Sequence, residues 1–144
     1  MAAKLFGSAA LVIAATGFFI NRFTRAPFGI VTTGHISFSA DQLLLAFALL
    51  CAVFAALYYL VDRGAGAHLS HALSISHFLL WMFAIVAFSV EEAALNDAVR
   101  TGHDPNQSWL ILGGSAAAVL AFFIGGLLFV LNLVLAITRR LRAS

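Results

Sequence analysis

Four long apolar stretches take up most of the chain, and short segments with polar residues, glycine or proline separate them. The stretches run from about residue 4 to 22, 41 to 61, 72 to 95 and 109 to 138. A transmembrane helix needs about 20 mostly apolar residues to cross a hydrocarbon core of about 30 Å. The pattern therefore predicts an all-α bundle of four transmembrane helices, with residues 1 to 144 forming a single membrane domain.

The first stretch also resembles the apolar region of a signal peptide, because it follows Lys4 and contains two alanine pairs. We expect it to be retained as a helix. The segment from Thr24 to Ala40 contains proline and glycine and is predicted to be a loop, and a second polar loop is expected around Gly102 and Pro105.

The composition supports a membrane protein and excludes two other classes. Hydrophobic residues make up 62% of the chain and charged residues 10%, whereas about half of an ordinary soluble domain is apolar. The net charge of +2 does not indicate nucleic-acid binding, because the basic residues are scattered at the ends of the apolar stretches. The single cysteine, Cys51, excludes an intramolecular disulfide and a cysteine metal cluster.

The basic residues of the short connecting segments predict the orientation. With four spans, five of them fall on one side and three on the other. Because cytoplasmic segments carry the excess of lysine and arginine, we expect a multi-pass protein with both termini in the cytoplasm. The larger group consists of Lys4, Arg63, Arg139, Arg140 and Arg142, and the smaller group of Arg22, Arg25 and Arg100.

Small residues in the fourth stretch recur at spacings that bring Gly114, Ala118, Ala121 and Gly125 to one helical face. Such faces let two helix backbones approach closely in lipid, where no hydrophobic drive joins helices. They indicate packing against other membrane subunits or a second copy of the chain. We expect the Asn132 amide in the same helix to turn inward, because an unpaired amide in hydrocarbon is costly.

Several short motifs follow one another in an order that resembles heme-copper oxidase subunit I. They are the pair Tyr58-Tyr59, the turn at Arg63, the pair His77-Phe78 with Trp81, and the run from Leu127 to Val134 that contains Asn132. In that family the tenth helix ends in a similar tyrosine pair, the eleventh begins with His-Phe, and the twelfth closes with Leu-Phe-x-x-Asn-Leu. The resemblance covers about residues 39 to 137, and the chain looks like a small four-helix relative of the last helices of that subunit.

The heme ligands of the family are missing. Its tenth helix carries a His-Phe-His-Tyr motif, and counting back from Tyr59 places that motif at Ala40, Asp41, Gln42 and Leu43. The copper ligands and the cross-linked tyrosine belong to helices that have no counterpart in this chain. The resemblance thus implies an accessory or assembly subunit of a respiratory membrane complex, with no cofactor and no independent catalysis.

Two alternatives stay open. In the first, a partner subunit completes a heme b site that uses His77 or His35, although topology places these two histidines near opposite membrane surfaces. The ordinary role for a histidine near a helix end is a hydrogen bond to a carbonyl group or a lipid headgroup. In the second, the chain is a quinone-, lipid- or ion-handling bundle whose cleft is lined by Phe47, Phe54, Tyr58 and Tyr59.

Acidic residues gather where the third stretch ends. Glu91, Glu92 and Asp97 form a candidate proton-entry or docking patch, since a buried carboxyl in a membrane protein often handles protons. The simpler interpretation is that Glu91 and Glu92 face water and stop the span. His35, His103 and Asp104 belong to the same side, but no ligand spacing connects them and no metal is predicted.

Overall fold

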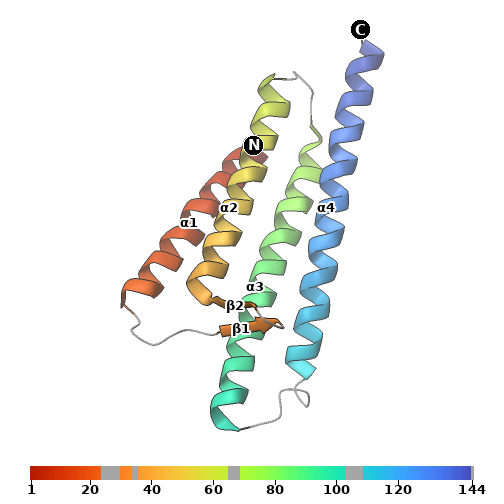
Figure 1. Ribbon diagram of the computed structural model, residues 1–144. Helices are drawn as coiled ribbons and strands as arrows, with labels where there is room; N and C mark the ends of the chain where they lie inside the picture. The colour runs from red at the N-terminus through yellow and green to blue at the C-terminus, as the bar shows by residue number, and fades with distance from the viewer. Residues whose placement is uncertain (24–29, 34–35, 65–68, 103–108, 144) are drawn as a thin grey trace.

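The computed structural model describes residues 1–23, 30–33, 36–64, 69–102 and 109–143, and this part of the chain contains four long helices. They are α1 (Ala2–Phe23), α2 (Ala40–Tyr59), α3 (His71–Thr101) and α4 (Trp109–Ala143) (Figure 1). Each includes a segment long and apolar enough to cross a membrane. The predicted all-α fold of a multi-pass membrane protein is confirmed.

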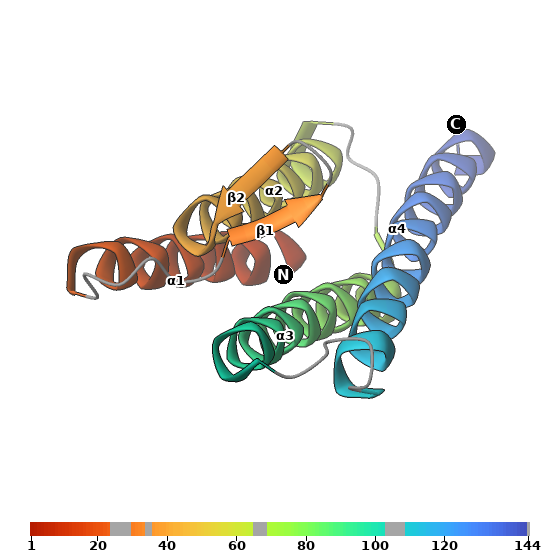
Figure 2. The same cartoon turned by 60° about the horizontal axis from the view of Figure 1, so that its bottom comes forward.

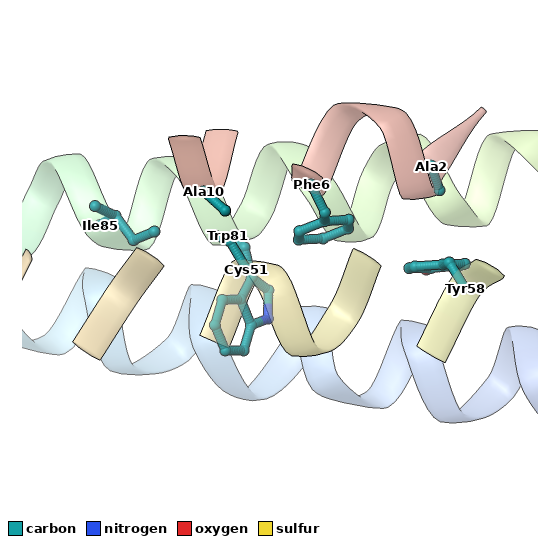
Figure 3. Packing of buried hydrophobic residues seen from close by; sticks show 7 residues of the cluster. All are labelled: Ala2, Phe6, Ala10, Cys51, Tyr58, Trp81 and Ile85. Carbon is teal, nitrogen blue, oxygen red and sulfur yellow. The ribbon is translucent and has the colours of Figure 1, made fainter. Parts of the chain in front are cut away.

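The helices are arranged as two antiparallel pairs. Figures 1 and 2 show α1 beside α2 and α3 beside α4, and the ends of the chain lie toward the same end of the bundle. The two pairs diverge toward the opposite end (Figure 1). Buried side chains of α1, α2 and α3 form the hydrophobic core between the two pairs (Figure 3). The core residues are Ala2, Phe6, Ala10, Cys51, Tyr58, Trp81 and Ile85.

Helices α2, α3 and α4 extend beyond the apolar stretches that predict them, and α4 reaches Ala143 instead of ending near residue 138. After α2 the chain continues as a short π-helix, η1 (Leu60–Gly64), so the helical rod reaches past the predicted end at residue 61. Helix α3 continues to Thr101 instead of ending near residue 95. Gly102 follows it with a φ of 71°, the left-handed conformation that commonly terminates a helix. Glu91 and Glu92 thus do not end the helix, while the apolar segment within it, His71–Leu95, ends near the predicted position.

The predicted loop between α1 and α2 contains two short strands. Strand β1 (Ile30–Thr33) pairs antiparallel with β2 (Ile36–Ser39), and Val31 lies opposite Phe38. β-Branched residues favour strands, and two residues between two such runs are typical of a hairpin. His35 is one of these two connecting residues and lies outside the described residues.

The small-residue face of α4 packs within the chain. A Cβ placed on Gly114 would contact Glu91 Cβ of α3 at 3.4 Å, and one on Gly125 would lie 2.7 Å from Trp81 Cδ1. Ala118 and Ala121 between them are buried. In the structure this face therefore packs against α3 of the same chain.

Asn132 of α4 connects the two helices of the α3 and α4 pair at the end where α3 begins. Its Oδ1 accepts a hydrogen bond of 2.8 Å from the backbone N–H of Ser70, and its Nδ2 donates to the Ser74 hydroxyl at 2.9 Å and to the Ser70 carbonyl at 3.2 Å. The amide is almost fully buried. The prediction that Asn132 turns inward is confirmed, and its partner is the start of α3.

Candidate functional site

A buried hydrogen bond joins the end of α2 to the beginning of α3. The Tyr58 hydroxyl lies 3.0 Å from Nδ1 of His77, and both side chains are almost completely enclosed. Tyr58 shares its helical face with Phe54 and Cys51, which precede it by four and seven residues. His77 thus bonds to another side chain, and not to the carbonyl group or headgroup expected from its position in the sequence.

Aromatic rings from all four helices surround the imidazole of His77. Besides the Tyr58 ring at 5.9 Å, four ring centroids lie within 6 Å of its own, at 4.9 Å for Phe6 of α1, 4.7 Å for Phe54 of α2, 5.9 Å for Trp81 of α3 and 5.4 Å for Phe129 of α4. The Phe6 ring also stacks on the Tyr58 ring, with a centroid distance of 5.7 Å. The Tyr58 and His77 side chains therefore lie where the two helical hairpins, α1 with α2 and α3 with α4, contact each other.

These residues do not fit a heme. An axial histidine must direct one ring nitrogen at the iron, with space beside it for a planar macrocycle. Because Nδ1 of His77 is bonded to Tyr58, only Nε2 could bind iron, and Nε2 is buried without a hydrogen-bond partner among the described residues. Ring contacts occupy the surroundings of the imidazole, and His71 lies exposed on a different face of α3. A heme at His77 would require the four helices to separate.

The acidic residues do not form one exposed patch. Glu91 Oε1 accepts a hydrogen bond from the Ser115 hydroxyl of α4, while its Oε2 is buried and unpaired within the described ranges. Glu92 is buried and Asp97 is exposed. Glu91 therefore lies in the contact between α3 and α4, at the position where Gly114 of α4 comes close to it. His103 and Asp104 lie outside the described residues.

The aromatic residues predicted to line a cleft are divided between two environments. Tyr58 and Phe54 pack around His77, and Phe47 lies against the core. Tyr59 is 59% exposed on the outer surface of α2. The four rings thus do not enclose a common space for a quinone.

A half-open pocket of about 80 Å³ lies at the end of the bundle that carries the N-terminus, and the sequence does not predict it. Its walls come from the first turn of α1, the end of α2 with η1, and the beginning of α3. Tyr58 reaches the pocket from the core, so the pocket touches the hydrogen-bonded pair. The polar residues along it are Tyr58, Asp62, His71 and Ser74.

Metal-ligating side chains do not come together elsewhere in the described ranges, since no three histidine, cysteine or acidic residues there form a group that could hold an ion. Comparison with protein-family models, curated proteins and solved structures gives no match to the chain. The resemblance to heme-copper oxidase subunit I stays a prediction that these comparisons do not test.

Proposed function

We propose that the chain is a small accessory or assembly subunit of a respiratory membrane complex and carries no heme of its own. The observation that supports this most is the environment of His77. This histidine matches the start of an oxidase helix, yet its Nδ1 is bonded to Tyr58 and rings from four helices enclose it. Its role in this proposal is to hold the helices together.

The outer surface of the bundle suits contact with lipid and with other membrane subunits. Large apolar side chains are exposed on each of the four helices, including Phe18 on α1, Leu49 on α2, Phe83 on α3 and Phe123 on α4. The small-residue face of α4 is occupied by α3, so a partner subunit is expected on this larger side-chain surface.

The charges at the end of the bundle that holds both termini support a cytoplasmic location for that end. Lys4, Arg63, Arg139, Arg140 and Arg142 belong to it and are exposed. Lysine and arginine next to short spans favour the cytoplasmic side. In this orientation the Tyr58 and His77 pair lies near the cytoplasmic surface.

Copurification and deletion test the proposal together. A tagged chain extracted from its native membrane in mild detergent is expected to migrate with a larger cytochrome-containing complex. Deleting the gene is expected to reduce the amount of assembled complex, and complementation with the intact chain should restore it. If the chain migrates alone, and the respiratory complexes are unchanged in amount and activity without it, the proposed role is wrong.

A further inference from the structure

The C-terminal end of α4 extends past the beginning of α3, at the end of the bundle that holds both termini (Figure 1). Asn132 is hydrogen-bonded to Ser70 and Ser74, so it marks the level at which α3 begins. From Asn132 to Arg142 the helix rises by about 15 Å. The apolar segment of α4 ends at Arg142. The last two turns therefore lie at the membrane boundary, where hydrocarbon gives way to lipid headgroups.

One face of these turns is apolar. Val134, Ile137 and Leu141 share that face, because they are spaced by three and four residues, and all three side chains are exposed. Leu127, seven residues before Val134, extends the same face toward the middle of the membrane and is exposed as well. The apolar surface that α4 turns toward lipid thus continues to Leu141, close to the end of the helix.

The rest of the circumference is basic. Arg140 and Arg142 flank Leu141 in the sequence, so they lie about 100° from it on opposite sides of the helix axis. Arg139 lies nearly opposite Leu141, and all three arginines are exposed. Helix α4 contains no aspartate or glutamate. A terminal carboxylate on Ser144 would offset one of the three positive charges and leave a net charge of the same sign.

Other charges at this end of the bundle do not reverse the sign. Asp62 of η1 is the acidic side chain there among the residues that the structure describes, and its neighbour Arg63 and Lys4 of α1 are basic. All three are exposed. The end of α4 is therefore an amphipathic, positively charged helix end at the depth of the headgroups.

We propose that this end of α4 binds anionic phospholipids of the adjacent leaflet. A guanidinium group donates paired N–H bonds to phosphate oxygens, and clustered arginines next to a membrane span attract an anionic lipid surface. The acyl chains of the same lipid cover the face of Leu141. An acidic segment of a soluble protein would match the arginines but not this face, because the face is continuous with the lipid-exposed surface of the span.

A comparison of two lipids with the same acyl chains tests the proposal. Phosphatidylglycerol and phosphatidylcholine each contain one phosphate, but only phosphatidylglycerol has a net negative charge. The full chain, purified and delipidated in a non-ionic detergent, is offered equal amounts of the two lipids, and the retained lipid is measured by native mass spectrometry. We expect phosphatidylglycerol to be retained in clear preference. Equal retention of the two lipids would overturn the proposal.

Two double variants connect the preference to α4. Arg139→Gln with Arg142→Gln is expected to lower the preference by at least about tenfold, because one basic residue near an anionic surface contributes about fivefold. Lys4→Gln with Arg63→Gln removes the same charge from the same end of the bundle and is the matched control, which should retain most of the preference. An equal loss in both double variants would contradict a site on α4.

Two further outcomes would assign the arginines another role. Arginine near a helix C-terminus also stabilises the helix through its dipole. A lower thermal midpoint of the Arg139→Gln and Arg142→Gln variant in lipid-free detergent, with the lipid preference intact, would indicate this role and refute the proposal. Loss of a copurifying protein from that variant, in a chain without any lipid preference, would assign the surface to an acidic protein segment instead.

Discussion

Gly125 of α4 lies directly against the indole of Trp81 on α3. A Cβ at Gly125 would be 2.7 Å from Cδ1 and 3.1 Å from Nε1 of that ring, and 3.5 Å from Cδ2 of His77. The absence of a side chain at one position of α4 thus allows the two helices to enclose the imidazole. The small residues that recur along α4 thus allow α4 to pack closely against α3 of the same chain.

Replacing Gly125 with alanine is therefore expected to destabilise the protein. Gly→Ala in a helix interior ordinarily stabilises by up to about 1 kcal/mol, but overpacking a close contact costs about 1–3 kcal/mol. We expect a net loss of stability, measured as a lower thermal midpoint in detergent. Gly126→Ala is the matched control, because a Cβ there meets no atom within 4 Å, and it should be neutral or stabilising. Equal behaviour of the two variants would contradict the close approach of α4 to Trp81.

Removal of the Tyr58 hydroxyl is expected to weaken the junction between the hairpins. In Tyr58→Phe, Nδ1 of His77 loses its partner in a buried site, and an unsatisfied buried polar group costs about 1–3 kcal/mol. Tyr59→Phe removes the same atom from an exposed ring and should change little. A double-mutant cycle with His77→Phe is expected to give a coupling energy of at least about 0.5 kcal/mol. Additive effects would show that the two side chains do not interact.

The Asn132 amide is expected to stabilise the α3 and α4 contact by a modest amount. Its three hydrogen bonds reach Ser70 and Ser74, and bonds between transmembrane helices contribute about 0.6 kcal/mol on average and up to about 1.7. Asn132→Leu should lower the midpoint of unfolding in detergent by more than Leu131→Ala does at the neighbouring exposed position. An unchanged midpoint in Asn132→Leu would mean that the amide network contributes nothing.

The thiol of Cys51 is expected to be protected in the folded protein. It is fully buried in the core with Phe6 and Trp81. A maleimide reagent should therefore label the intact chain slowly and the denatured chain at once. Arg142→Cys in a Cys51→Ser background places a thiol at an exposed position near the end of α4 and should react rapidly without denaturation. Rapid labelling of Cys51 in the native protein would show that the core is open.

The spans could be predicted from the sequence because the membrane imposes one requirement on all of them, a minimum apolar length. The junction at Tyr58 and His77 could not, because it depends on where the end of α2 crosses the beginning of α3. The enclosure of Glu91 likewise depends on the α4 register that brings Ser115 opposite it. The strands at residues 30 to 39 did have a local signal, two runs with β-branched residues separated by two residues, one of them glycine.

The most direct test of the proposed function is the heme content of the purified complex with and without the imidazole of His77. The absorption spectrum and the heme-to-protein ratio are measured for assemblies that contain wild-type chain or His77→Phe, which fills the aromatic enclosure with another ring. We expect the heme content per assembled complex to be the same in both, and the isolated chain to be colourless. A stoichiometric heme b in the isolated wild-type chain, lost in His77→Phe while the chain remains folded, would contradict a subunit without a heme of its own.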